Sequence, residues 1–161
     1  MPVTTDITAT YRGPARVMRR LLAMGQREDR ALVFVMAFCL IAFVAQLPGL
    51  ARRAHLESLD LQMLMGGTLM GTVFLLPLVL YLLAGLSHLL ARLVGGRGTW
   101  YRARIALFWS LLASAPLVLL HGLVKGFVGA GPALNVVGLL WLGAFLWFWI
   151  SSLSIAERPD P

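Results

Sequence analysis

The chain has 161 residues, of which 59% are hydrophobic and 13% are charged, and this composition excludes an ordinary soluble domain. The formal net charge of +7 would suit a nucleic-acid-binding protein, but the basic residues border long apolar stretches. We therefore expect anionic lipid head groups as partners and no nucleic acid. Cys39 is the only cysteine, which excludes an internal disulfide and a metal site made of cysteines.

Residues 1–30 form a polar and basic cytoplasmic leader, in which we expect one amphipathic helix. Residues 1–10 are expected to be loosely ordered, and Pro14 suits the first turn of a helix over residues 15–30. At 100° per residue, five arginines fall on one side of this helix, opposite aliphatic residues. They are Arg16, Arg19, Arg20, Arg27 and Arg30. This pattern favours a helix lying flat in the head-group layer of a membrane, and docking on a partner protein is the alternative.

Four stretches without Asp, Glu, Lys or Arg follow the leader. They cover residues 31–51, 61–91, 105–124 and 126–156. Each is long enough to cross a hydrocarbon core about 30 Å thick, which takes roughly 20 helical residues. They predict an all-α integral membrane protein with four transmembrane helices after the N-terminal interfacial helix. We expect a bundle over 31–154, with spans at about 31–50, 61–91, 103–124 and 133–154, and a cytoplasmic tail over 155–161.

Prolines modify three of these spans. The first span is expected to end at Pro48-Gly49, before a short loop that includes Arg52 and Arg53. The second run would measure about 46 Å as a single helix, which exceeds the thickness of the core, and Pro77 lies near its middle. It forms either one long tilted or kinked helix or two half-helices that re-enter on the same side. Pro116 predicts a kink near the centre of the third span.

The distribution of Lys and Arg favours a single crossing by the second run. In that topology the side of the termini holds six basic residues in the leader, four between 92 and 104 and one in the tail. The opposite side holds only three, so the positive-inside rule is obeyed, whereas re-entry would remove the bias. We therefore expect four spans with both termini in the cytoplasm.

The spans offer little for catalysis. His88 and His121 are the only titratable candidates expected at membrane depth, and the topology places them near opposite faces. They are expected to bond to backbone or lipid phosphate rather than to share a metal. No carboxylate lies inside a span, and Ser87-His88 lacks the third member of a catalytic triad. We predict no catalytic residue, cofactor or metal.

Two pairs of glycines, Gly67 with Gly71 and Gly122 with Gly126, have the spacing that allows helix backbones to approach closely. We expect packing inside the bundle, with dimerisation between chains, and hence a homo-oligomer, as the alternative.

The most distinctive stretch is Gly95-Gly96-Arg97-Gly98-Thr99-Trp100-Tyr101-Arg102. It has neither dinucleotide-binding nor P-loop spacing, and it predicts a tight cytoplasmic turn. Arg97, Arg102, Arg104 and Trp100 are expected to contact lipid phosphates, or alternatively a cytoplasmic protein.

A basic helix before the first span, the Gly-Gly-x-Gly-Thr-aromatic turn at Gly95–Trp100, and the span with a central proline (Phe108–Pro116) together resemble the bacterial branch of the Ypt-interacting (Yip) family. The resemblance implies a multispanning protein of the bacterial inner membrane and carries no enzymatic residues. The eukaryotic branch is implicated in vesicle traffic and contacts small GTPases.

The sequence therefore predicts a non-enzymatic membrane scaffold or assembly protein that binds lipid head groups, a membrane or cytoplasmic protein partner, or both. One alternative is an accessory subunit of a larger inner-membrane complex, held through Gly67, Gly71 and the tryptophan-rich fourth span. The other is a small transporter or lipid-handling protein, which only Pro77, Pro116 and Asn135 suggest.

Overall fold

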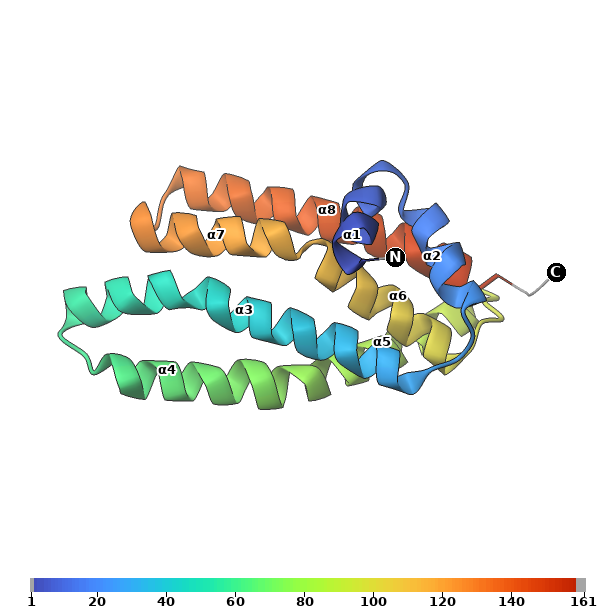
Figure 1. Cartoon of the computed structure of the whole chain (residues 1–161), viewed down its shortest axis with the longest axis horizontal. Coiled ribbons are helices and arrows are strands. Elements are labelled where there is room, and N and C mark those ends of the chain that lie inside the picture. Colours follow the sequence, from blue (N-terminus) through green and yellow to red (C-terminus); the bar gives the residue numbers. More distant parts are fainter. Residues whose placement is uncertain (1, 159–161) are drawn as a thin grey trace.

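The structure, a computed structural model, describes residues 2–158, and it is helical almost throughout (Figure 1). The elements are α1 (Val3–Arg12), α2 (Pro14–Ala23), α3 (Glu28–Glu57), α4 (Leu61–Leu69), the π-helical turn η1 (Met70–Leu75), α5 (Leu76–Leu93), α6 (Trp100–Ala113), α7 (Ala115–Phe127) and α8 (Pro132–Ala156). The predicted all-α class is confirmed. The helices α3, α4–α5 and α8 are long and apolar enough to cross a membrane, and the bent pair α6–α7 makes a fourth if it counts as one span.

Helix α6 lies at the centre of the molecule. Every residue from Ile105 to Ala113 is buried, as expected for a helix that is apolar on all sides. It packs against α3, α5 and α8, while α3 also packs along α7 and α4 (Figure 1). The outer helices α4–α5 and α8 face outward with much of their apolar surface. In the most apolar 18-residue stretch of each, only 17% is buried inside the molecule. Such extensive exposed apolar surface suits contact with lipid.

The leader is more ordered than predicted. Residues 1–10 were expected to be loose, but α1 occupies Val3–Arg12. Two contacts hold it: the buried Thr10 hydroxyl accepts a hydrogen bond from Trp109 Nε1 of α6 at 3.1 Å, and Asp6 pairs with Arg20 of α2.

The single helix predicted over residues 15–30 is also wrong. Helix α2 ends at Ala23, and Gly25 adopts a φ of +83°, a left-handed conformation that ends helices readily. Helix α3 then begins at Glu28, where Glu28 and Asp29 in the first turn interact favourably with the helix dipole. Arg27 and Arg30 therefore do not extend the arginine face of α2.

The first long helix does not end at Pro48-Gly49. Helix α3 continues to Glu57, and only residues 58–60 connect it to α4. Two tertiary contacts support the extension: Arg52 donates hydrogen bonds to the carbonyl oxygens of Gly126 and Phe127, both at 3.3 Å, and the Lys125 stem packs against Gly49. The helix therefore continues past the proline because its last turns have a neighbour to pack on.

The second run forms one continuous rod over Leu61–Leu93 rather than two half-helices folded back on each other. The π-helical turn η1 ends at Leu75, two residues before Pro77. Proline lacks the N–H that would continue an α-helical ladder, and its ring collides with the carbonyl one turn earlier. A widened turn accommodates both constraints without breaking the helix.

The kink predicted from Pro116 is confirmed. Helices α6 and α7 meet at 45° around Ser114, two residues before the proline. The Ser114 hydroxyl donates to the Leu111 carbonyl at 2.9 Å and accepts from Trp141 Nε1 of α8 at 3.2 Å. The bend is thus held by a polar contact with the neighbouring helix.

Candidate functional site

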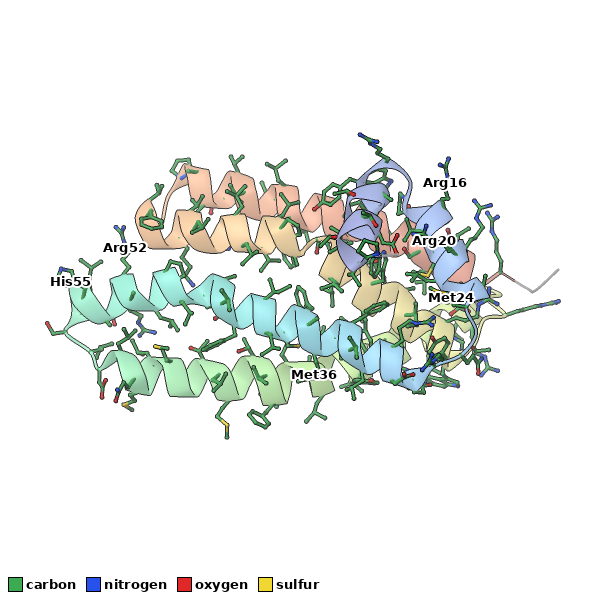
Figure 2. All side chains as sticks on the ribbon, in the orientation of Figure 1. Arg16, Arg20, Met24, Met36, Arg52 and His55 are labelled. Atoms are coloured by element: carbon green, nitrogen blue, oxygen red, sulfur yellow. The ribbon has the colours of Figure 1, made fainter. Side chains whose placement is uncertain are left out.

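Basic side chains gather at both ends of the molecule, with Arg16 and Arg20 at one end and Arg52 and His55 at the other (Figure 2). We call the first the arginine end and define it as α2, the α2–α3 connection with the first turn of α3, residues 92–99, and the first two turns of α6. Its arginines are Arg16, Arg19, Arg20, Arg27, Arg30, Arg92, Arg97, Arg102 and Arg104. All the arginines predicted to bind lipid or a partner therefore belong to one end.

Helix α2 is seated on the protein by its apolar face. Val17, Met18 and Leu21 are fully buried, and α2 packs against α8. The sequence favoured lipid contact for this face, whereas the structure covers it with the chain's own helices. Arg16 and Arg19 lie on the exposed side, so only the arginine side of α2 is available to head groups or a partner.

Three arginines of α2 and the start of α3 have structural partners. Arg20 pairs with Asp6, Arg27 with Asp29 at 3.1 Å, and Arg30 donates to the Leu21 carbonyl at 3.3 Å. By contrast, Arg16, Arg19 and Arg97 form no ion pair with any residue between 2 and 158. Arg92 is likewise exposed and forms no ion pair within residues 2–158, so these four exposed guanidinium groups of the arginine end have no acidic partner in the described part of the chain.

The glycine-rich turn wraps around the carboxylate of Glu157, immediately after α8. The Gly98 N–H donates to Glu157 Oε2 at 3.0 Å, and the Arg97 N–H donates to the Glu157 carbonyl at 3.0 Å. A Cβ on Gly96 would lie 2.8 Å from Glu157 Oε2, and one on Gly98 would overlap the Ala156 carbonyl. The glycines of the motif are thus explained by close packing against the end of α8.

His88 completes this buried cluster. Its Nδ1 is hydrogen-bonded to Glu157 Oε1 at 2.8 Å, and the two side chains are 2% and 8% exposed. The ring also lies 4.7 Å from the Trp100 ring, centroid to centroid. The prediction that His88 bonds to backbone or lipid is therefore wrong, because a carboxylate 69 residues away reaches it.

Glu157 is the residue that sequence reasoning missed. It was assigned to a cytoplasmic tail over 155–161, but α8 continues to Ala156, and Ile155, Ala156 and Glu157 are buried. Residues 159–161 of that tail lie outside the described residues. The available signal was a lone carboxylate directly after a long uncharged span, at the same end of the molecule as a histidine.

Arg102 and Trp100 have different roles in the structure. Arg102 donates to the carbonyls of Ile155 and Arg158 at 3.4 and 3.3 Å, so it caps the C-terminal end of α8. Trp100 is 47% exposed and shares a groove of about 330 Å³ with Arg104, lined otherwise by α5. Arg104 pairs with Glu28 at 2.9 Å and lies over the Tyr81 ring at 5.9 Å.

The two glycine pairs lie in opposite settings. A Cβ on Gly122 would overlap the Ala45 carbonyl, and one on Gly126 would overlap Pro48, so this pair lies at the close contact of α3 with α7. Gly67 and Gly71 have nothing within 4 Å of a Cβ position and are exposed. Gly67 and Gly71 therefore pack against no other helix in the described part of the chain.

The arrangement is suited to binding anions by exposed guanidinium groups beside an aromatic groove. Comparison with known proteins gives no match to a protein family, to a characterised protein or to a solved structure. The resemblance to the Yip family remains a prediction from residues 95–116.

Proposed function

We propose that this protein is a non-enzymatic scaffold or assembly protein of the bacterial inner membrane, which binds anionic lipid head groups through the arginine end. In this proposal the chain crosses the membrane four times, with α6–α7 as the third span and both termini in the cytoplasm. The single observation that supports it most is the grouping of Arg16, Arg19 and Arg97, which are exposed and form no ion pair within residues 2–158.

Electrostatics support lipid as the partner. Each Lys or Arg near an anionic leaflet contributes about 1 kcal/mol of attraction. Because α2 is held on α8 by its buried apolar face, its arginines are presented on a rigid support. Trp100, half-exposed beside Arg104, has the position that tryptophan favours at a membrane interface. The positive-inside bias favours the cytoplasmic leaflet for this end.

The same surface would suit an acidic face of a cytoplasmic protein, as the family resemblance implies. Co-purification in a mild detergent followed by mass spectrometry tests this form of the proposal. If a stoichiometric partner co-purifies with the wild type but not with R16Q/R19Q, a protein partner is favoured over lipid.

A second candidate, an accessory subunit of a larger complex, is favoured by Gly67 and Gly71. They lie outward on α4 and η1 and contact no other helix of the described chain. Small residues allow a partner helix to approach closely in lipid, where packing is a main source of attraction. This candidate fails if the purified protein always migrates as a single small species.

The head-group proposal is tested on the full-length protein in a neutral detergent. Phosphatidylglycerol or phosphatidylcholine is titrated and bound lipids are counted by native mass spectrometry. The double variant R16Q/R19Q should weaken phosphatidylglycerol binding at this end by about 30-fold, corresponding to roughly 2 kcal/mol. The matched control R16K/R19K keeps both charges and should bind like the wild type. Equal affinity of R16Q/R19Q and wild type would refute the proposal, and reporter fusions that place either terminus in the periplasm would refute the topology.

A further inference from the structure

A large apolar cleft lies outside the arginine end. It has a volume of about 990 Å³ and is lined by residues of α3, η1, α5, α6, α7 and α8. Leu80 and Leu83 line it from α5, Leu142 and Phe145 from α8, and Phe38 from α3. A cleft of this size lies in the range of small-molecule sites.

The bend between α6 and α7 and the π-helical turn η1 both border this cleft. Helix α6 packs against both α5 and α8, but α7 leaves it at an angle of 45° and packs along α3 and α8 instead (Figure 1). On the other side, the π-helical turn η1 contributes Thr72, and Leu76 follows it. Discontinuous helices that meet at mid-membrane are where membrane proteins commonly build binding sites.

One end of the cleft is polar and basic. His121 and Lys125, one turn apart on α7, line it together with Asn135 of α8 and Gln46 of α3. Among residues 2–158, no Asp or Glu lines this cleft. A cation at the edge of an apolar cleft with no carboxylate beside it is electrostatically complementary to an anion.

These polar groups have unused hydrogen-bonding capacity. Gln46 donates to the Ala42 carbonyl at 3.3 Å. Within residues 2–158, however, Lys125 forms no ion pair, and the side chains of His121 and Asn135 have no hydrogen-bond partner. The stem of Lys125 packs against Gly49, which holds the side chain between α3 and α7. Lys125 and Asn135 are exposed and His121 is half-buried, so all three side chains are accessible at this end of the cleft to a ligand with acceptor oxygens.

We propose that this cleft binds an anionic phospholipid of the leaflet opposite the arginine end. One acyl chain lies between α5 and α8, and the phosphate lies at Lys125 and His121, with Asn135 as a further donor. The proposal rests on the membrane insertion proposed above, but not on lipid binding at the arginine end.

The size of the cleft favours an acyl chain over a helix of a partner protein. A helix about 10 Å across that enters half of a 30 Å core would occupy roughly 1,200 Å³, more than the cleft provides. A zwitterionic lipid such as phosphatidylcholine also has a phosphate, but the cation of its own head group would lie beside Lys125 and weaken the attraction. The occupant is therefore expected to be both slender and negatively charged.

The test uses the full-length protein in detergent, with phosphatidylglycerol and phosphatidylcholine as probes and native mass spectrometry as the measurement. We expect one phosphatidylglycerol molecule to be retained that R16Q/R19Q does not remove. K125Q should weaken its binding about tenfold or more, whereas K125R should bind like the wild type.

A second pair of variants tests the apolar part of the cleft. Gly138 lines the cleft on α8, and a Cβ there meets only ordinary contacts, 3.5 Å from His121. G138L would place a branched side chain in the cleft beside His121 and should weaken retention of this lipid. The matched control G143L adds the same side chain on the same helix, where Gly143 is exposed with nothing within 4 Å, and should leave retention unchanged.

Three results would overturn the proposal. The first is unchanged phosphatidylglycerol retention in K125Q and G138L. The second is equal retention of phosphatidylcholine, which would mean non-specific surrounding lipid. The third is loss of an oligomer in G138L on size-exclusion chromatography, which would make the cleft a helix interface. Failure of the arginine-end proposal is a separate outcome, because it is measured by phosphatidylglycerol binding to R16Q/R19Q and not to these variants.

Discussion

The arginine end and the basic end of the cleft use polar residues in opposite ways. At or beside the arginine end, three polar side chains have partners within the chain: His88 with Glu157, Arg102 with the end of α8, and Asp6 with Arg20. At the cleft, His121, Lys125 and Asn135 have no such partners between residues 2 and 158. The comparison teaches that the sequence does not distinguish a histidine reached by a distant carboxylate, such as His88, from one that no carboxylate reaches among residues 2–158, such as His121.

The largest expected effect comes from removing the carboxylate that holds the arginine end together. E157A would leave His88 and the Gly98 N–H without their buried acceptor, and each buried group left without its hydrogen bond costs about 1–3 kcal/mol. Thermal unfolding in detergent, followed by circular dichroism, should show a clearly lowered Tm.

The control for this variant is E57Q. Glu57 is exposed and pairs with Arg53 at 2.9 Å, so its loss should change stability by less than about 1 kcal/mol. If the two variants unfolded at the same temperature, the buried cluster would not stabilise the arginine end.

The next largest effect concerns the glycine pairs. G122A places a methyl group against the Ala45 carbonyl at the contact of α3 with α7, and overpacking of this kind costs about 1–3 kcal/mol. G67A adds the same methyl group at an open position and should keep or slightly raise the Tm, because alanine favours a helix over glycine. A lowered Tm in G67A with loss of a dimer on size-exclusion chromatography would instead assign Gly67 to an interface between chains.

The smallest effect is expected from R104Q. Its salt bridge with Glu28 is largely exposed on the Glu28 side, so its loss should cost between about 0.2 and 1 kcal/mol of stability. Phosphatidylglycerol binding at the arginine end should nevertheless weaken measurably, because Arg104 borders the Trp100 groove. R104K should restore that binding, and a variant with lowered stability but unchanged lipid binding would assign Arg104 a purely structural role.

Several wrong predictions share one cause. The helix after Pro48, the ordered α1 and the burial of Glu157 each depend on a partner far along the chain: Gly126 and Phe127 for Arg52, Trp109 for Thr10, and His88 for Glu157. Local signals such as a proline, a polar run or a terminal carboxylate carry no information about those partners. The apolar face of α2 was assigned to lipid for the same reason, since periodicity shows that a face is apolar but not what covers it.

The sequence by itself determined the helical class, the long uncharged runs and the bend at Pro116, because these depend on local backbone chemistry and on the length and polarity of each segment. Only the tertiary structure decided that α2 packs on α8, that the glycine turn wraps around Glu157, and that His121 and Lys125 line a cleft. The reason is that pairing and burial are properties of side chains brought together from distant segments, and apolar composition alone leaves lipid and protein as equally suitable neighbours.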